Sequence, residues 1–305
     1  MRVLASDPIA STAVAALRGA GLDVDEKTDL TPEALAAEIG AYDVLVVRSA
    51  TKVRAPIIDA GGRLKLIVRA GVGLDNIDVD YAREKGIEVR NTPAASSNSV
   101  AELALAHILS LARHIGRGTA SMKSGRWEKK ALKGIEIDGK TLGLIGLGRI
   151  GCALAKKAVA LGMRVIAYDA FLDTCPVPGL AEMVSLDELL AQSDFISLHI
   201  PFDPEVGAVL GSAEFARMKN GVRIVNCARG GVVDEQALVN AMKRGKVGGA
   251  ALDVFAVEPP SGEEELLALD NISLTPHIGA ATVEAQDRVG AEAAQIVIDF
   301  ARSAA

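Results

Sequence analysis

Short runs of apolar residues alternate along the chain with longer stretches in which apolar side chains recur at helical spacing. In the first part of the chain the short runs cover residues 3–5, 44–47, 64–68 and 87–89, and helical patterns start near residues 11, 32 and 56. Thr31 and Pro32 form a typical helix start, with proline at the first helical position. Because strands that alternate with helices usually pair in parallel, this pattern predicts a parallel sheet.

The same alternation resumes near residue 141. Apolar runs cover residues 141–145, 165–168, 195–199, 222–227, 249–254 and 272–275. Ser185 and Asp234 each precede a helical pattern as N-caps, and Ser99 with Glu102 has the spacing of a capping box before a long apolar helix that extends to about residue 115. A last helical pattern, residues 283–301, has no strand after it, and we expect it to pack back on the first region.

These patterns predict an α/β protein with two doubly wound parallel-sheet domains. The chain has 305 residues, of which 50% are hydrophobic, and this suffices for two ordinary cores. We expect residues 1–96 and 281–305 to form one discontinuous domain and residues 97–280 to form a second domain inserted into it.

A glycine-rich motif opens the second of these regions. Gly146, Gly148 and Gly151 form a G-x-G-x-x-G sequence between an apolar run and a helical pattern, and Asp169 ends the next apolar run. In this context the glycines allow a tight turn and a close approach to a pyrophosphate, which the helix N-terminus would bind. Asp169 would accept hydrogen bonds from the adenosine ribose and repel a 2′-phosphate. The motif predicts a Rossmann domain that binds NAD in preference to NADP.

Charge and cysteine content exclude several classes of function. The formal net charge is −6, so the chain lacks the basic balance that nucleic-acid binding requires. The three cysteines are far apart and have neither metal-ligand nor disulfide spacing, which suits a reducing compartment, and we expect no metal. The apolar runs are too short to span a bilayer, and the N-terminus reads as a first strand and not as a signal peptide. We therefore expect a cytoplasmic protein with small-molecule ligands and no membrane partner.

Three successive predicted strands in the second region are followed by residues suited to hydride transfer. Arg229 follows the first of these strands, Glu258 the second and His277 the third. Oxidation of a 2-hydroxy acid needs a base for the hydroxyl proton, a carboxylate that orients the base, and a clamp for the substrate carboxylate. His277 fits the first role, Glu258 the second and Arg229 the third, because a guanidinium offers two parallel donors to a carboxylate. An ion pair with Glu258 would favour the charged imidazolium and fix its tautomer unless desolvation offsets this.

The other three histidines are weaker candidates. His199 also ends a predicted strand, and we expect it to line the cofactor site or to cap that strand. His107 and His114 lie within the long helix predicted after residue 99, and we expect them to have packing or interface roles.

The first region contains a second group of candidates for ligand binding. Arg48 and Lys52 follow one predicted strand, and Arg69 ends another, directly before a glycine-rich turn at residues 70–73 whose N–H groups could hold an anion. These cations would form a positive rim suited to a substrate with a second anionic group. Residues 123–133 carry five basic residues and Trp127, and this segment reads either as a solvated linker or as an arm that attracts phosphate.

Taken together, the motifs resemble those of the D-isomer-specific 2-hydroxyacid dehydrogenases, and within that family the phosphoglycerate dehydrogenase branch. The family motifs lie at residues 146–151 with Asp169, and at residues 226–235, 252–260 and 276–280. The branch is indicated by residues 48–53, 69–76 and 121–130. The resemblance covers essentially the whole chain and implies a Rossmann NAD domain inserted in a discontinuous flavodoxin-like substrate domain.

The resemblance also implies the reaction and the site residues. The expected reaction is the oxidation of D-3-phosphoglycerate at the start of serine biosynthesis, by a triad of Arg229, Glu258 and His277 in a homodimer built through the nucleotide domains. With the motifs above, we expect contacts with NAD from Gly146, Gly148, Arg149, Ile150, Gly151, Asp169, His199, Ile200, Pro201, Cys227, Ala228, Arg229, Asp253, His277, Gly279 and Ala280. We expect contacts with the substrate from Arg48, Ser49, Lys52, Arg69, Val72 and Gly73.

Two departures from the family pattern bear on selectivity and regulation. Ser96 stands where relatives often carry an asparagine, which could alter substrate affinity. The printed sequence has no counterpart of the C-terminal regulatory domains of longer relatives, so we expect no feedback by serine through such a domain. Two alternatives stay open: a hydroxypyruvate, glyoxylate or other D-2-hydroxyacid dehydrogenase with the same triad, and an NAD-sensing protein that acts by binding partners.

Overall fold

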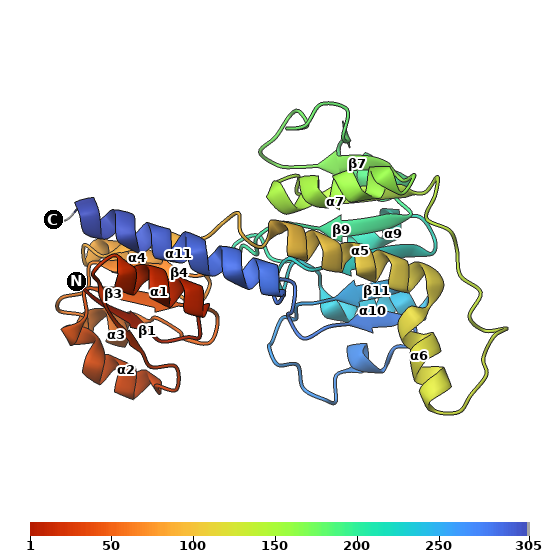
Figure 1. The fold of residues 1–305 in the computed structure, drawn as a ribbon. Coiled ribbons are helices and arrows are strands. Elements are labelled where there is room, and N and C mark those ends of the chain that lie inside the picture. The colour runs from red at the N-terminus through yellow and green to blue at the C-terminus, as the bar shows by residue number, and fades with distance from the viewer. Residues whose placement is uncertain (304–305) are drawn as a thin grey trace. The chain divides into compact units, whose positions relative to one another are not determined.

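The computed structural model describes residues 1–303, and these fold into two compact units (Figure 1). Unit 1 contains Met1–Ser96 and the segment from Ala280 onward, and unit 2 contains Ser97–Gly279. The second junction falls one residue before the expected boundary, so that Ala280 belongs to unit 1.

Unit 1 is built on a five-stranded parallel sheet. Its strand order is β2-β1-β3-β4-β5, which is the flavodoxin-like order. The strands are β1 (Arg2–Ala5), β2 (Asp23–Glu26), β3 (Val44–Val47), β4 (Leu66–Arg69) and β5 (Glu88–Asn91). The helices are α1 (Ser11–Gly19), α2 (Pro32–Glu38), η1 (Ile39–Ala41), α3 (Ala55–Ala60), α4 (Val79–Glu84) and α11 (Val283–Ser303).

Each face of this sheet is covered by helices. Strand β3 is fully buried, as expected for a central strand with helices on both faces. The C-terminal helix α11 packs on α1 and β4 of the same unit, and Figure 1 shows α1 and α11 side by side. A Cβ placed on Gly290 of α11 would lie 3.0 Å from the Cβ of Ala10 and 3.2 Å from that of Ala13. The small residue therefore permits the close approach of the two helices.

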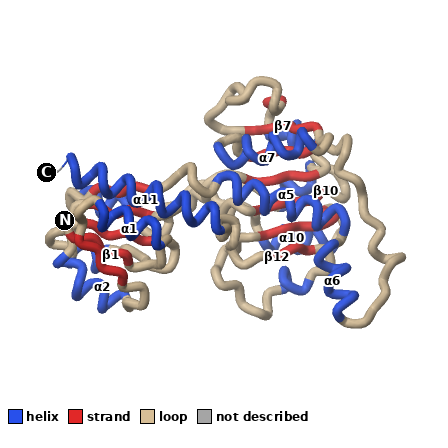
Figure 2. Tube along the Cα trace, in the orientation of Figure 1, coloured by secondary structure: helices blue, strands red, loops and turns tan. Residues whose placement is uncertain are grey.

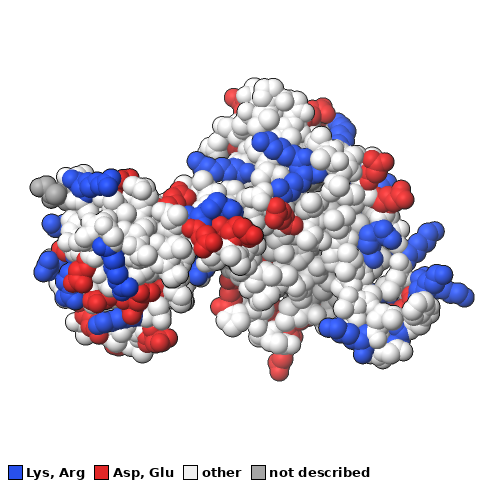
Figure 3. Space-filling view, viewed as in Figure 1, with Lys and Arg blue, Asp and Glu red and all other residues white. Residues whose placement is uncertain are grey.

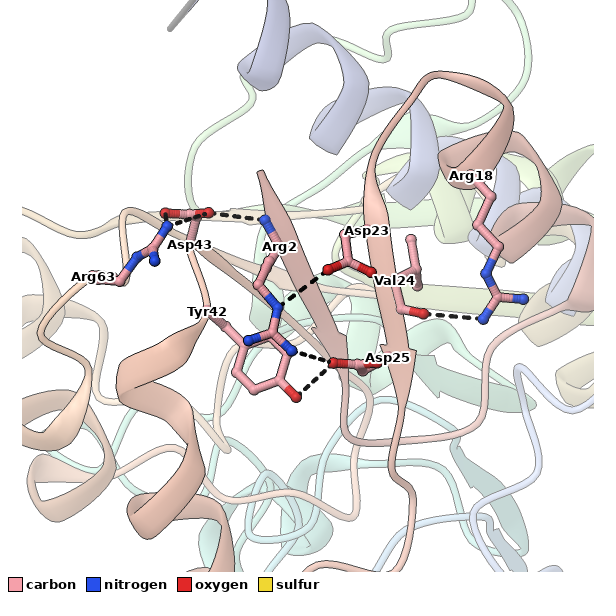
Figure 4. A network of polar contacts seen from close by, with 8 residues as sticks. All are labelled: Arg2, Arg18, Asp23, Val24, Asp25, Tyr42, Asp43 and Arg63. Atoms are coloured by element: carbon pink, nitrogen blue, oxygen red, sulfur yellow. Dashed lines mark hydrogen bonds and ion pairs between the residues drawn. The ribbon is translucent and has the colours of Figure 1, made fainter.

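Strand β2 was missed by the sequence reasoning. Its sequence, Asp23 to Glu26, contains one apolar residue, so no alternating pattern marks it. Charged and hydrogen-bonded side chains hold it against β1: the Arg2 guanidinium lies 3.3 Å from Asp23 and 2.8 Å from Asp25, and the Tyr42 hydroxyl donates to Asp25 (Figure 4). The hydrogen bond from Tyr42 and the pairing with Arg2 lower the pKa of Asp25, although burial opposes them.

Unit 2 is built on a seven-stranded parallel sheet, and Figure 2 shows its strands between layers of helices. Its strand order, β12-β11-β10-β9-β6-β7-β8, is the Rossmann order extended by one strand. The strands are β6 (Thr141–Ile145), β7 (Arg164–Tyr168), β8 (Glu182–Met183), β9 (Phe195–Leu198), β10 (Val222–Asn226), β11 (Val247–Leu252) and β12 (Ile272–Leu274). The helices are α5 (Ser97–Arg113), α6 (Ile115–Lys123), α7 (Arg149–Ala160), α8 (Leu186–Gln192), α9 (Ser212–Arg217), α10 (Glu235–Lys243) and η2 (Glu265–Ala268).

Three of the predicted helix caps are confirmed and one is wrong. Thr31, Ser185 and Asp234 each accept a hydrogen bond from a backbone N–H of the helix that follows. Helix α5 begins at Ser97, two residues before the predicted cap, so Ser99 lies inside its first turn. The Ser99 hydroxyl is buried and donates to the Gly279 carbonyl, so a tertiary contact and not a capping box uses this side chain.

Candidate active site

The glycine-rich turn between β6 and α7 is tight on its protein side. Gly146 has φ 93°, and a Cβ there would lie 2.6 Å from the His199 carbonyl oxygen. A Cβ on Gly151 would lie 2.4 Å from the Gly146 carbonyl oxygen, whereas one on Gly148 would meet no atom within 4 Å. The turn is therefore closed behind Gly146 and Gly151 and open in front of Gly148, where the N-terminus of α7 offers unpaired N–H groups to a pyrophosphate.

Asp169 follows β7 and lies beside this turn. Its Oδ2 accepts a hydrogen bond of 2.8 Å from the Leu147 N–H, and its Oδ1 accepts one of 2.9 Å from the Phe171 N–H. These two bonds fix the orientation of a half-buried carboxylate, and each oxygen keeps a lone pair for a ribose hydroxyl.

His199 follows β9. In the sheet, β9 lies between β6, which leads to the glycine-rich turn, and β10, which leads to Arg229. Nε2 of His199 lies 3.0 Å from the Ser197 hydroxyl, and its buried Nδ1 has no hydrogen-bond partner within residues 1–303. Burial lowers the pKa of this histidine to about 4, so the ring is neutral at physiological pH. Burial also raises the pKa of the nearby candidate Cys227, which keeps its thiol protonated. An unpartnered ring nitrogen, an open cradle and an oriented acidic residue together fit a dinucleotide.

His277 and Glu258 form a hydrogen-bonded pair. The distance from His277 Nδ1 to Glu258 Oε2 is 2.7 Å, and both side chains are partly exposed. Glu258 Oε1 accepts a further hydrogen bond from the Phe255 N–H, which fixes the carboxylate at the end of β11. The paired geometry leaves Nε2 of His277 as the ring nitrogen available for proton transfer.

Arg229 follows β10, the strand that pairs with β11. Its backbone turn is held by Asn226, whose side-chain amide donates to the Arg229 carbonyl. A Cβ on Gly230 would lie only 1.8 Å from the Phe255 carbonyl oxygen, so the loop of Arg229 packs directly on the loop that leads to Glu258. Because β11 also pairs with β12, the three predicted catalytic residues follow three adjacent strands of one sheet.

The backbone around His277 is strained and anchored. His277 has φ 53°, in the left-handed region that side chains other than glycine rarely adopt. The Asp253 carboxylate, 1% exposed, accepts hydrogen bonds of 2.8 Å from the N–H groups of Ile278 and Gly279. Sequence reasoning assigned Asp253 to NAD and missed this anchoring role, although an aspartate at the end of the neighbouring strand was a signal for it. A direct contact of Asp253 with NAD stays a prediction.

A pocket of about 490 Å³ adjoins the His277–Glu258 pair. Apart from the pair and Thr275, its walls are apolar. The apolar lining consists of Phe255, Pro259, Pro260, Leu267, Leu274 and Pro276.

The substrate-site candidates lie in unit 1, at the ends of two paired strands. Arg48 and Lys52 follow β3, and Arg69 is the last residue of β4. The side-chain amide of Asn76 donates to the Arg48 carbonyl, which fixes the loop after β3. Gly71 has φ 148°, and a Cβ there would lie 1.2 Å from the Arg69 guanidinium, so the guanidinium rests against this glycine. Ser49, Val72 and Gly73 are neighbours of these residues in the same two loops.

Within residues 1–303, the structure offers neither a metal-binding cluster nor a membrane-spanning helix. No group of three or more His, Cys, Asp or Glu side chains in this range could hold a metal ion. None of the helices in the same range is both long and apolar enough to span a bilayer.

Comparisons with known proteins place these features in a family. Residues 105–279 match the family model described as D-isomer specific 2-hydroxyacid dehydrogenase, NAD binding domain. The chain is 56% identical over 273 residues to hydroxypyruvate reductase of Thermotoga maritima. The aligned residues make up 89% of this chain and 86% of that protein. The chain is 47% identical over 303 residues to D-3-phosphoglycerate dehydrogenase of Archaeoglobus fulgidus. Here the aligned residues make up 99% of this chain and 58% of the relative. The chain thus spans little more than half of that second relative.

A solved structure shows the same fold with ligands. D-lactate dehydrogenase from Aquifex aeolicus, complexed with NAD and lactic acid, superposes with a TM-score of 0.85 at 32% sequence identity. The match covers 99% of this chain and 96% of that one.

Proposed function

The chain belongs to the D-isomer-specific 2-hydroxyacid dehydrogenase family, and within it we propose that the protein oxidises D-3-phosphoglycerate to 3-phosphohydroxypyruvate, the entry to serine biosynthesis. NAD is the cofactor of this family model and of the solved relative. The observation that carries the proposed chemistry is the 2.7 Å pair of His277 and Glu258 beside the strand end that bears Arg229.

His277 acts as the base in the direction of oxidation. Its Nδ1–H donates to Glu258, so the lone pair on Nε2 accepts the proton of the substrate C2 hydroxyl. The Glu258 carboxylate then stabilises the imidazolium that forms. Bound NAD supplies the acceptor for the hydride that leaves C2. In the reverse direction, the imidazolium returns its proton to the carbonyl oxygen.

Arg229 binds the carboxylate of the substrate. Its guanidinium can give two parallel, charge-assisted hydrogen bonds, and this fixes the orientation of C2. The close contact between Gly230 and Phe255 couples the position of this clamp to the Glu258 loop.

The phosphate of the substrate requires a second anion site. Arg48, Lys52 and Arg69 supply three cations at the ends of β3 and β4, and we assign unit 1 to substrate binding on this basis. Similarity to several phosphoglycerate dehydrogenases over nearly the whole chain supports this assignment.

The proposal is tested by comparing the initial rates of NADH formation with D-3-phosphoglycerate, D-glycerate and D-lactate, in the presence of a trap for the oxo acid. D-Glycerate is the matched control because it lacks only the phosphate. We expect strong preference for the phosphorylated acid. Turnover of D-glycerate or D-lactate without turnover of D-3-phosphoglycerate would be consistent with the proposed catalytic residues and would refute the phosphate site.

A second candidate function is the reduction of hydroxypyruvate. The 56% identical relative is named hydroxypyruvate reductase, and the chain covers most of its length. Rates of NADH oxidation with hydroxypyruvate and with 3-phosphohydroxypyruvate separate the two functions. Both functions use the same catalytic residues, and the two substrates differ only in the phosphate.

A further inference from the structure

His107 lies on the buried side of α5, and its imidazole faces β12. The residue is 3% exposed. Its Nδ1 lies 3.0 Å from the Ser273 hydroxyl and its Nε2 lies 3.1 Å from the Thr275 hydroxyl. Sequence reasoning gave this histidine a packing or interface role, but its two ring nitrogens contact Ser273 of β12 and Thr275, the residue after that strand.

The directions of these hydrogen bonds follow from counting protons. Thr275 donates its single hydroxyl proton to Asp253 over 2.6 Å, so it can only accept from His107. Nε2 of His107 therefore carries a proton. Because burial lowers the pKa of His107, the ring is neutral, and Nδ1 is the ring nitrogen without a proton. The Ser273 hydroxyl lies 3.0 Å from Nδ1 and 3.3 Å from the Ser110 hydroxyl, and it has one proton for these two contacts.

The network ends at the backbone on the C-terminal side of His277. Asp253 receives the Thr275 hydroxyl on Oδ1, which also accepts the Ile278 N–H, and its Oδ2 accepts the Gly279 N–H. A continuous path of hydrogen bonds thus runs from α5 through a threonine and a carboxylate to the two residues that follow His277.

We propose that His107 is a positioning residue for His277, acting through Thr275 and Asp253. A left-handed His277 needs neighbours that hold it there, and an acid–base group must be placed within a fraction of an ångström. By donating to Thr275, His107 orients the hydroxyl so that its proton points at Asp253, and the carboxylate then holds both backbone N–H groups. This inference rests on the proposed function, in which His277 is the acid–base group.

Three substitutions at position 107 separate positioning from simple packing. His107→Gln places an amide nitrogen near the position of Nε2 and can still donate to Thr275. His107→Asn places one near Nδ1 and reaches only toward Ser273, and His107→Leu keeps the bulk without a donor. Ser273→Ala is the matched control, because it removes the branch of the network that does not lead to Asp253.

Two readouts test the proposal: kcat and KM with NAD and the hydroxy acid that the wild type oxidises best, and amide hydrogen exchange of Ile278 and Gly279 in the protein without added ligands. We expect His107→Leu and His107→Asn to lower kcat by about tenfold or more, with little change in the KM for NAD, and to speed the exchange of both amides. His107→Gln and Ser273→Ala should stay close to wild type in both readouts.

Wild-type exchange and kcat in His107→Leu would overturn the proposal, and so would equal losses in His107→Gln and His107→Leu, because packing alone would then explain them. If His107→Leu does not fold, Thr275→Val removes the same path without changing α5 and should give the same two effects. A wild-type enzyme that oxidises no hydroxy acid would refute the proposed function, whereas the exchange measurement would still report on the anchoring of the turn.

Discussion

At the scale of single residues, the site depends on carboxylates whose hydrogen bonds fix the orientation of the groups on either side. Glu258 orients the imidazole of His277, Asp169 is held by the N–H groups beside the glycine-rich turn, and Asp253 holds the turn that carries His277. Sequence spacing predicted roles for Glu258 and Asp169, because each follows a strand in a known motif. It did not reveal that Asp253 accepts backbone N–H groups, since that depends on how two neighbouring loops meet.

Glu258→Gln should lower kcat without preventing folding. The amide can still meet Nδ1 of His277, but it no longer stabilises the imidazolium. We expect a fall in kcat of roughly 10²-fold or more, which is typical for loss of general acid–base assistance. Steady-state kinetics check this, with the exposed Glu263→Gln as a control that should keep wild-type rates. An unchanged kcat in Glu258→Gln would remove Glu258 from the mechanism.

Asp169→Ala should weaken the discrimination between NAD and NADP. The substitution removes the acceptors for the ribose hydroxyls and the charge that repels a 2′-phosphate. The ratio of kcat/KM for the two cofactors measures this effect, and Asp173→Ala, which changes an exposed acidic residue in the same loop, should leave the ratio unchanged. A constant ratio in Asp169→Ala would show that another group sets the preference.

His199 should make the free energy of unfolding depend on pH. Its folded pKa of about 4 lies below the ordinary histidine value, so between pH 6.5 and 4 the unfolded chain binds the proton first. The contribution of His199 is complete above about pH 6.5 and is lost as the pH falls toward 4, with an upper size of roughly 3 kcal/mol. Urea unfolding at pH 7 and pH 5 should show a smaller loss of stability in His199→Gln than in the wild type, and an equal loss would contradict the burial of a neutral ring.

At the scale of elements, strand ends position the chemistry. The turn between β6 and α7 carries the candidate nucleotide-binding glycines, and the ends of β10, β11 and β12 carry the three catalytic candidates. The apolar runs predicted these strands within a few residues, because a strand buried on both faces is apolar throughout. The apolar pattern did not predict β2, because this strand is charged and is held by side-chain contacts with residues elsewhere in the chain. It did not predict β8 either, because this strand is short and is held by pairing at the edge of the sheet. The break between α5 and α6 at His114, with φ 55°, also had no sequence signal.

Gly146→Ala and Gly148→Ala should differ in their effect on stability, and both should weaken the binding of NAD. A Cβ on Gly146 meets the His199 carbonyl at 2.6 Å at a φ of 93°, so we expect Gly146→Ala to lower the melting temperature by several degrees and to abolish NAD binding. A Cβ on Gly148 meets open space, so Gly148→Ala should fold normally and bind NAD less tightly. Thermal unfolding and calorimetric NAD titration measure the two effects. Tight NAD binding by both variants would place the cofactor elsewhere.

At the scale of the whole molecule, the chain combines a flavodoxin-like unit with a Rossmann unit. The alternation of apolar runs and helical patterns predicted two parallel-sheet domains, and the resemblance to the family implied that the first is flavodoxin-like. On the face shown in Figure 3, acidic and basic side chains are interspersed. Exposed apolar side chains gather on α6 and the segment after it, where Ile115 is 54%, Met122 58% and Trp127 78% exposed. Ile115 and Met122 are seven residues apart and therefore share one face of α6, and a contiguous exposed apolar face is typical of a surface that a partner covers.

We propose that this surface takes part in a homodimer. Sedimentation velocity should show a dimer at micromolar concentration, and Trp127, the single tryptophan of the chain, should shift its fluorescence to shorter wavelength as the dimer forms. Met122→Glu should shift the equilibrium toward monomer, whereas Val206→Glu, an exposed apolar residue of another loop, should not. A monomer at all concentrations would refute the proposal.

Direct hydride transfer from C2 of a D-2-hydroxy acid is the central claim, and a labelled substrate tests it most directly. D-3-Phosphoglycerate that carries deuterium at C2 is incubated with NAD and the wild-type protein, and the reduced cofactor is examined by NMR. We predict that the deuterium appears at C4 of the nicotinamide ring and that His277→Ala, with its base removed, transfers it at a rate lower by orders of magnitude. Deuterium released to water, or a His277→Ala rate equal to the wild type, would contradict the mechanism.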